Sequence, residues 1–141
     1  MEKVGEHTGL MYYTIGQRKG LNIGGNKDKM FVVGKNLESN ILYVSFGEDN
    51  HYLISNSCVL EQVNFNCDER PTKCTAKFRY RQIDYNVELD YLDNGQIIVK
   101  YDGIKSVTPG QACVFYLGEK CIGGGIIKEV RFNNEKLWYL L

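Results

Sequence analysis

Residues 85–101, YNVELDYLDNGQIIVKY, contain two strand-like segments separated by a turn. Asp93-Asn94-Gly95 lies at the turn, with residues 85–91 before it and 96–101 after it. An Asn-Gly pair tolerates the positive φ angles of a tight chain reversal. This stretch therefore predicts an antiparallel β-hairpin, and the rest of the fold can be read outward from it.

Further strand-like segments lie on both sides of this hairpin, at the spacing of a small β-barrel or a β-sandwich. They are found near residues 57–63, 73–81, 111–117 and 121–129. Thr108-Pro109-Gly110-Gln111 fits a type II turn, because Pro presets φ at the first central position and Gly accepts positive φ at the second. This turn should place Gln111 at the start of a strand. The expected fold class is mainly β.

Nearer the N-terminus, residues 30–33 and 41–46 predict a second hairpin, joined through turn-forming residues at 35–40. Glycines interrupt the first thirty residues, which are expected to be rich in loops. The polar stretch 47–51 is the best candidate for a boundary between two modules. At 141 residues, the chain suits one ordinary domain or two small ones.

The charge balance excludes a strong overall attraction to nucleic acid or anionic lipid, because seventeen basic residues face seventeen acidic ones. Any contact with RNA must therefore come from a local patch. The apolar stretches are too short to span a bilayer, and the N-terminus lacks the apolar core of a signal peptide. We expect a cytoplasmic protein.

The cysteines are odd in number and widely spaced, without a C-x-x-C pair, and only two histidines accompany them. This pattern argues against a disulfide framework and against a zinc site. We expect reduced thiols that pack in the core, although Cys74 and Cys121 could also be considered as sulfur carriers. The five residues are Cys58, Cys67, Cys74, Cys113 and Cys121.

Residues 73–82 combine alternation with positive charge. In a strand, alternate side chains face opposite sides, so one face would carry Cys74, Ala76, Phe78 and Tyr80. The other face would carry Lys73, Thr75, Lys77, Arg79 and Arg81. Such a row of cations can follow a phosphate backbone, with a tyrosine stacked on an unpaired base. The alternative is a solvated face balanced by Glu88 and Asp90, and spacing alone favours that alternative.

Other motifs have ordinary interpretations. The loop Gln17-Arg18-Lys19 lies between glycines and displays its charges, but it lacks the P-loop spacing. Gly123-Gly124-Gly125 lacks the dinucleotide-binding spacing and indicates a bulge or a close backbone approach. His7 and His51 lack a recognisable nucleophile partner, so polar or capping roles are expected.

Six phrases taken together resemble the C-terminal part of the bacterial tRNA-specific 2-thiouridylases, in order and in approximate spacing. The resemblance covers residues 5 to about 129, and the agreement of six separate phrases makes it specific. The phrases are residues 5–9, 13–21, 31–33, 78–82, 107–111 and 121–125.

The resemblance implies an ATP-dependent enzyme that adenylates the C2 oxygen of the wobble uridine of tRNA and then transfers persulfide sulfur to C2. ATP with Mg, the nucleophilic cysteine and the persulfide cysteine would belong to an N-terminal catalytic domain ahead of residue 1. A sulfur-relay donor protein would serve the parent enzyme. The chain by itself is expected to be inactive, without catalytic, cofactor or metal residues of its own.

The resemblance also implies contacts with the anticodon arm of tRNA, and not with DNA or membrane. The family's tRNA-binding positions match Arg79, Tyr80 and Gln111, which reverses the preference drawn from spacing alone. Arg79 would supply charge, Tyr80 a stacking or hydroxyl contact, and Gln111 hydrogen bonds. A strand end, twist or bulge is expected at Arg79, since a regular strand would point it away from Tyr80. Weaker candidates are Lys77, Arg81, Gln17, Arg18 and Lys19.

The predicted organisation has three parts. Residues 1–50 would be the remnant of a central β-rich domain, 51–131 a tRNA-binding barrel like those of translation factors, and 132–141 a tail. The alternative is a stand-alone β-barrel, binding RNA or protein, that has no catalytic partner.

Overall fold

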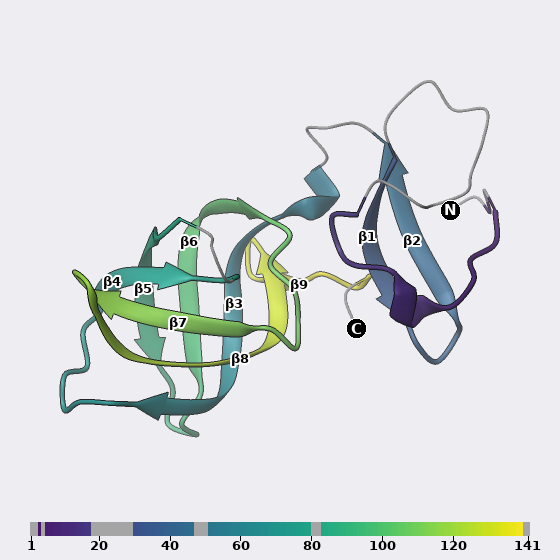
Figure 1. The fold of residues 1–141 in the computed structure, drawn as a ribbon. Helices are drawn as coiled ribbons and strands as arrows, with labels where there is room; N and C mark the ends of the chain where they lie inside the picture. Colours follow the sequence, from purple (N-terminus) through teal and green to yellow (C-terminus); the bar gives the residue numbers. More distant parts are fainter. Residues whose placement is uncertain (1–2, 4, 18–29, 47–50, 80–82, 140–141) are drawn as a thin grey trace.

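The computed structural model describes residue 3 and residues 5–17, 30–46, 51–79 and 83–139. The described part is mainly β, as predicted: besides strands, it contains only two short 3-10 helices, η1 (Leu10–Tyr12) and η2 (His51–Leu53). Figure 1 shows a barrel beside a small two-stranded sheet. No helix in these residues has the length and apolar character needed to cross a membrane.

The larger body is a closed six-stranded antiparallel barrel rather than a sandwich. Its strands follow the order β3-β6-β5-β4-β7-β8, and a pairing between β3 and β8 closes the circle. Closure leaves no free edges among these strands. The strands are β3 (Ile54–Phe65), β4 (Lys73–Lys77), β5 (Tyr85–Tyr91), β6 (Ile97–Lys105), β7 (Ala112–Leu117) and β8 (Lys120–Phe132).

Both turns predicted in the barrel are present. Gly95 has φ 85°, and the Leu92 amide donates to the Gln96 carbonyl across the β5–β6 turn at 2.9 Å. Asn94 does not take a positive φ; its side-chain Oδ1 instead accepts a hydrogen bond from the Gln96 amide at 3.0 Å. Gly110 has φ 90°, as a type II turn requires, and Gln111 directly precedes β7.

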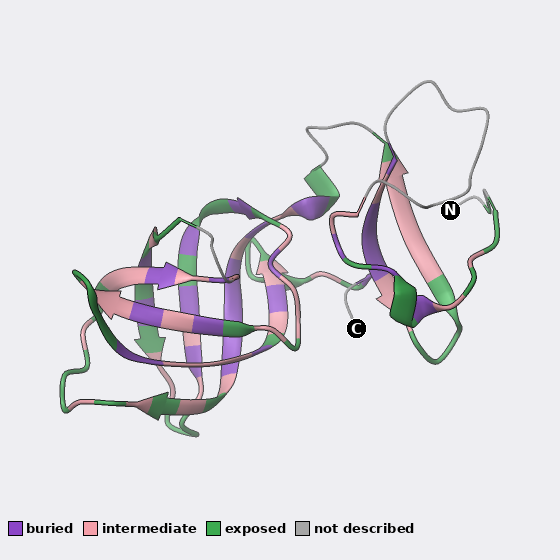
Figure 2. Cartoon of the chain, in the orientation of Figure 1, coloured by how far each residue is buried: buried purple, intermediate pink, exposed green. Residues whose placement is uncertain are grey.

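Buried residues alternate with more exposed ones along the strands of the barrel (Figure 2), and the buried side chains form its core. Phe115 is fully buried and stacks on Phe65 with ring centroids 6.1 Å apart, while Phe78 packs edge-on against Tyr101 at 5.0 Å. Each fully buried aromatic or aliphatic side chain stabilises the fold by about 1.5–3 kcal/mol. The other fully buried apolar residues of the barrel are Cys58, Leu60, Ala76, Ile97, Val99, Cys113, Ile122, Ile127 and Val130.

The glycine run in β8 is a site of close backbone approach, as predicted. A Cβ on Gly123 would collide with the Asn64 carbonyl oxygen, and one on Gly124 would collide with the Cys113 carbonyl oxygen. The register between β3 and β8 also shifts between Glu61 and Asn64. The glycines therefore let β8 pass tightly between its two neighbours.

The smaller body contains the predicted N-terminal hairpin, β1 (Met30–Asn36) and β2 (Ile41–Phe46), which pair antiparallel. Residues 13–17 run along β1, where the Gly16 amide donates to the Val32 carbonyl at 2.8 Å and the Val32 amide donates to the Gln17 carbonyl at 2.9 Å. We call residues 5–17 and 30–46 the small module. The predicted boundary at 47–51 falls largely outside the described residues.

The C-terminal residues connect the two bodies. Part of the predicted tail forms β9 (Glu135–Lys136), which pairs with β8. Residues 137–139, which we call the strap, then reach β1, where the Lys35 amide donates to the Tyr139 carbonyl at 3.0 Å. Gly34 makes this approach possible, because a Cβ there would collide with the Tyr139 carbonyl.

All five cysteines are free thiols, and they differ in burial. Cys58 and Cys113 lie in the core, whereas Cys67 and Cys74 are half-buried. Burial raises the pKa of the Cys58 thiol to about 12 and that of Cys74 to about 11. The prediction of core packing for all five is wrong for Cys121, which is exposed because it pairs with Tyr116 on the outer face while Ile122 points inward.

Candidate functional site

Arg79 lies just after β4 and bonds within the chain to two backbone carbonyls. Its Nη2 donates to the Ser106 carbonyl oxygen at 2.6 Å and to the Ile15 carbonyl oxygen at 3.4 Å. Ser106 belongs to the loop between β6 and β7, and Ile15 belongs to the small module. Burial lowers the pKa of Arg79 below its ordinary value, yet an arginine remains charged at neutral pH.

The loop that receives Arg79 is shaped by its own local bonds. Ser106 has φ 62°, and its carbonyl also accepts a hydrogen bond from the Thr108 hydroxyl at 2.9 Å. Gly16 lies opposite, with φ 90°, and a Cβ there would lie 2.8 Å from the Ser106 hydroxyl oxygen. We call Ile15, Gly16, Arg79 and Ser106 the junction.

The junction brings together three segments that are far apart in sequence. It draws residues from or directly beside the phrases 13–21, 78–82 and 107–111, which carried much of the family resemblance. Separate motifs that converge on one place indicate a shared role, and here the shared place is the contact between the small module and the barrel.

Two buried polar atoms near these segments have no hydrogen-bond partner among the described residues: Nε of Arg79 and Oε1 of Gln111. Leaving such an atom unsatisfied costs about 1–3 kcal/mol. The backbone of Gln111 is well bonded, since its carbonyl accepts from the Ile127 amide at 2.8 Å. The Gln111 side-chain oxygen is therefore a buried acceptor without a partner among the described residues.

The predicted row of cations on residues 73–81 does not continue along one face. β4 ends at Lys77, so the period of two that places Lys73 and Lys77 on the outer face stops before Arg79. The expected strand end therefore lies before Arg79. Tyr80 and Arg81 lie outside the described residues.

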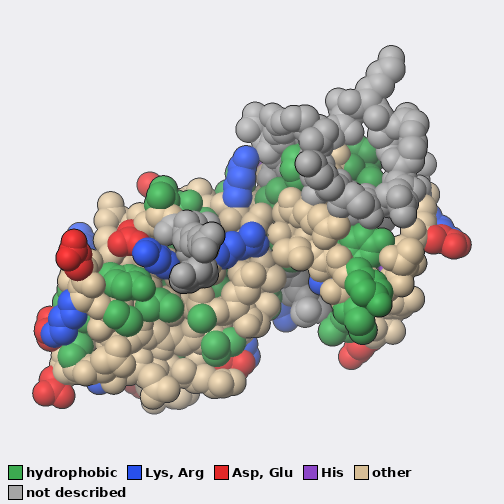
Figure 3. Space-filling model, in the orientation of Figure 1, with side chains coloured by type: hydrophobic (Ala, Val, Ile, Leu, Met, Phe, Trp, Pro, Cys, Tyr) green, Lys and Arg blue, Asp and Glu red, His purple; other side chains and the backbone are tan. Residues whose placement is uncertain are grey.

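The lysines of β4 are paired with acids. Lys77 lies 3.5 Å from Asp84, with 38% of its side chain exposed, and its Nζ is 5.3 Å from the centre of the Tyr116 ring. Lys73 lies 4.0 Å from Glu88, one of the two acids expected to balance this face. On the face shown in Figure 3, Lys and Arg side chains are scattered, and several lie beside Asp or Glu.

The loop at residues 17–19 is described only at Gln17. The Gln17 side-chain Oε1 accepts a hydrogen bond from the Thr14 amide at 2.9 Å, and its backbone pairs with Val32. Gln17 therefore holds the turn that presents Gly16 to the junction. Arg18 and Lys19 lie outside the described residues.

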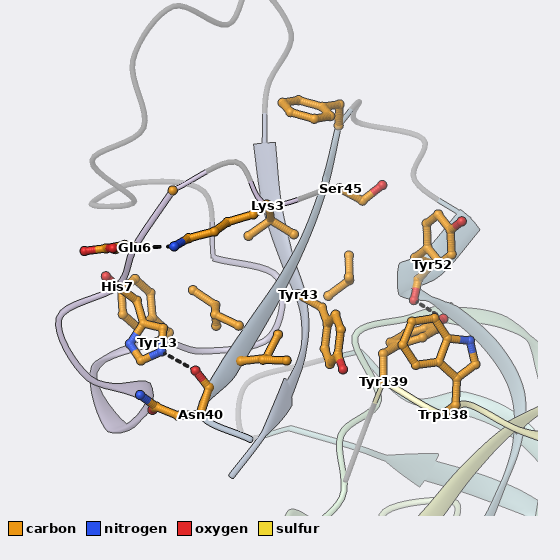
Figure 4. Close-up of a pocket in the computed structure, with 16 residues that line it drawn as sticks. Lys3, Glu6, His7, Tyr13, Asn40, Tyr43, Ser45, Tyr52, Trp138 and Tyr139 are labelled. Atoms are coloured by element: carbon orange, nitrogen blue, oxygen red, sulfur yellow. Dashed lines mark hydrogen bonds and ion pairs between the residues drawn. The ribbon is translucent and has the colours of Figure 1, made fainter. Parts of the chain in front are cut away.

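A groove of about 840 Å³, which the sequence did not predict, lies along β2 and the strap (Figure 4). Rings line one end of it: Trp138 contacts Tyr43 with centroids 5.2 Å apart, and Tyr139 contacts Tyr52 at 5.6 Å. The Tyr139 hydroxyl also donates to the Tyr52 carbonyl at 2.7 Å. Trp138 and Tyr139, which line this groove, belong to an apolar run at residues 137–141.

His7 has a structural role at the other end of the groove, as predicted. Its Nδ1 accepts from the Gly9 amide at 3.0 Å, so Nε2 carries the proton and donates to the Asn40 carbonyl at 2.9 Å. His51 packs against Tyr52 with ring centroids 4.1 Å apart. In the described ranges, no group of three or more His, Cys, Asp or Glu side chains could hold a metal ion.

Two family models match the chain. The tRNA methyl transferase PRC-barrel domain matches residues 1–46, and the aminomethyltransferase beta-barrel domain matches residues 55–127, which is more than half of the chain.

Curated relatives match across both modules. The tRNA-specific 2-thiouridylase MnmA of Mycoplasmopsis synoviae is 51% identical over 138 residues, covering 97% of this chain and 37% of the relative. The protein named tRNA-specific 2-thiouridylase MnmA 2 of Geobacillus kaustophilus is 53% identical and covers 99% of the chain and 38% of the relative. The MnmA of Bacillus cytotoxicus is 52% identical with the same coverage. The chain thus spans less than two fifths of the length of the curated relatives it matches.

Proposed function

Because the chain belongs to the family of tRNA-specific 2-thiouridylases, we propose that it is the part of such an enzyme that holds tRNA during sulfur transfer. The supporting observation is the similarity itself, which extends at about half identity over both the small module and the barrel. The relatives act on tRNA by name, so a domain of this kind has tRNA as its natural ligand.

In this proposal the parent enzyme is a cytoplasmic, ATP-dependent sulfurtransferase. Another domain binds ATP with Mg and adenylates the C2 oxygen of the wobble uridine. A persulfide cysteine, charged through a sulfur-relay protein, then delivers its outer sulfur to C2 while AMP leaves with the oxygen, and a second cysteine thiol forms a disulfide with the persulfide cysteine. The present chain contributes binding of the anticodon arm and does not thiolate RNA by itself. Its buried thiols fit this division of labour, because burial raises the pKa of Cys58 and Cys113, and the thiolate is the reactive form of cysteine.

Lys77 is a candidate for direct phosphate contact among the described residues. It is partly exposed and its ion pair with Asp84 spans 3.5 Å. Exposed ion pairs contribute only about 0–1 kcal/mol, so exchanging Asp84 for a phosphate has a small cost. Gln111 would offer its side-chain amide to the RNA, and Tyr80 would stack on an unpaired base.

Binding should be weak and sensitive to salt, because the chain has no net charge and its cations are local. The test is a titration of tRNA into the chain at two salt concentrations. We expect Lys77→Ala to lower the affinity several-fold and to reduce the slope of log affinity against log salt by about 0.7–0.9, the value for one lost phosphate contact.

Lys120→Ala is the matched control. Lys120 is an exposed lysine that pairs with Glu69 at 3.1 Å, at the β7–β8 turn, on the end of the barrel away from the small sheet (Figure 1). This variant should bind tRNA as the wild type does. Equal binding by all three proteins would exclude Lys77. Absence of tRNA binding by the wild type would instead favour a protein-interaction module, for which the acid-paired lysines of β4 would be an ordinary solvated face.

A further inference from the structure

The outer edge of β2 is open, whereas that of β1 is covered. Residues 16–17 and the strap lie along β1 and supply the backbone bonds at Val32 and Lys35. In the described part of the chain, β2 pairs with β1 alone. Only every second residue of an edge strand bonds to its neighbour. About half of the β2 amides and carbonyls therefore face away from β1, where another strand can bind them.

The sequence of β2 has none of the usual protections of a sheet edge. Natural edges are commonly blunted by charged residues, by proline or by a bulge. β2 reads ILYVSF, without charge, proline or glycine. The register shift of this sheet lies in β1, between Val32 and Gly34. An edge of this kind favours pairing with a further strand.

The groove along β2 has a shape that suits one added strand. It encloses about 840 Å³, and all six residues of β2 line it. Figure 4 shows a wall on each side of β2, with Glu6 and His7 on one side and Trp138 on the other. Alternate side chains of an added strand would face these two walls. No residue of β2 is fully buried, so the added strand would also complete the burial of β2.

We infer that β2 receives an extended, mainly apolar strand from another part of the parent protein, which completes the sheet of the small module. The strand is apolar because β2 is uncharged and because the ions at the groove, Lys3 and Glu6, pair with each other at 3.5 Å. Such a strand serves the assembly of the parent protein and is independent of the tRNA contact proposed above.

The comparisons with known proteins support a strand from the parent protein. The model that matches residues 1–46 describes a PRC-barrel domain by name, and a barrel is a sheet closed on itself. The described residues supply two strands of this sheet, which is short of closure. The curated relatives contain further chain that can supply a strand, since this chain covers 37–38% of their length.

A second copy of the chain fits the groove less well. Pairing of two β2 edges about a two-fold axis would place an identical groove opposite each groove. Two concave surfaces that face each other leave their walls uncovered, whereas a single strand lies between the walls of one groove. The shape therefore favours an added strand over a second copy.

The experiment measures hydrogen exchange of single amides in this chain and in the intact MnmA of Mycoplasmopsis synoviae, with each rate corrected for local sequence. In this chain, the β2 amides that face away from β1 should exchange quickly. In the intact relative, the aligned amides should be protected at least about tenfold more, because a strand bonds to them. Amides of β6 in the closed barrel are the matched control and should be protected in both proteins.

Analytical ultracentrifugation separates the added strand from a second copy. Protection of the outward β2 amides in the relative should not depend on its concentration. The inference is overturned if these amides exchange as quickly in the intact relative as in this chain. It is also overturned if they become protected only as either protein self-associates, since a second copy would then cover the edge. A failure of tRNA binding would reject the proposed function and leave this result unchanged.

Discussion

The barrel and the small module bury their apolar side chains and pair their backbone hydrogen bonds in different ways. The barrel closes on itself through the β3–β8 pairing and buries side chains from all six of its strands. The small module has only a two-stranded sheet, and an isolated pair of strands is at best marginally stable in water. The core of this sheet and the hydrogen bonds of β1 are completed by residues 13–17 of the same module and by the strap.

This difference implies that the barrel is stable by itself, whereas the small module depends on its contacts with the barrel and the strap. Changes inside the barrel should unfold the whole chain, and changes at the strap should affect the small module first. The position of Trp138, the single tryptophan, allows the two to be followed separately, because it contacts Tyr43 of β2.

The largest effect is expected from Phe115→Ala in the barrel core. Phe115 is fully buried, and truncating such a side chain costs about 3–5 kcal/mol. In urea unfolding, circular dichroism and Trp138 fluorescence should shift to lower urea together, because the small module depends on the barrel. Val114→Ala, at a half-buried neighbour, should shift the curve much less. A fluorescence transition that stays in place would show that the small module is independent.

The next effect is expected from Tyr139→Ala, which removes a buried ring of the strap and its hydrogen bond to Tyr52 at 2.7 Å. The small module should lose about 2–3 kcal/mol from the lost burial and the lost bond. Native-state hydrogen exchange should then speed up at the β1 amides of Val32 and Lys35 but not in β5 or β6. Tyr139→Phe, which removes only the hydroxyl, should have less than half this effect. Equal acceleration of hydrogen exchange in the small module and across the barrel would contradict a specific dependence of the small module on the strap.

A smaller effect, specific to the barrel, is expected at high pH. Burial raises the pKa of Cys58 from 9.0 to about 12, so the folded state keeps its proton when the unfolded state loses it. The free energy of unfolding should therefore fall as pH rises above 9, by at most about 1.4 kcal/mol between pH 9 and pH 10 for this group. Urea unfolding of Cys58→Ala under reducing conditions should show a shallower decline. An equal slope in both proteins would assign the effect to other groups.

The smallest effect is expected from Gly95→Ala in the β5–β6 turn. Gly95 has φ 85° and open space around its Cβ position, so the penalty is conformational and amounts to about 1 kcal/mol. The midpoint of thermal unfolding should be a few degrees lower. The hydrogen-exchange rates of the β1 amides should not change relative to those of the barrel amides. Asp93→Ala in the same turn is the control and should have a smaller effect. A large loss of stability would mean that this turn is needed for the folding of the whole barrel and not only for the β5–β6 hairpin.

Local chemistry explains what the sequence predicted well. The hairpin at 85–101 follows from Asn94 and Gly95, and the type II turn follows from Pro109 and Gly110, since each depends on neighbouring residues only. The strand positions followed from their spacing. The strand spacing alone left a barrel and a sandwich open, because the β3–β8 pairing joins segments some seventy residues apart. The barrel was predicted through the family resemblance, and the structure confirms it.

The candidate site was harder to predict for a similar reason. The alternation at 73–81 was extended through Arg79, but β4 ends at Lys77, and the partners of Arg79 lie 64 and 27 residues away. No local pattern marks a guanidinium that binds distant backbone carbonyls. The roles of Arg79 and Gln111 towards RNA stay predictions.

The strap has a consequence for how the protein is made. β1 is synthesised before the barrel, yet its Lys35 amide finds its partner in Tyr139, which leaves the ribosome more than one hundred residues later. Until then the small sheet has an uncovered edge and an unfinished core, whereas the barrel hairpins can already form. A chain that stalls or is trimmed before Tyr139 would keep an incompletely bonded small module, and proteases would cut at a site about one hundred residues before the missing ones.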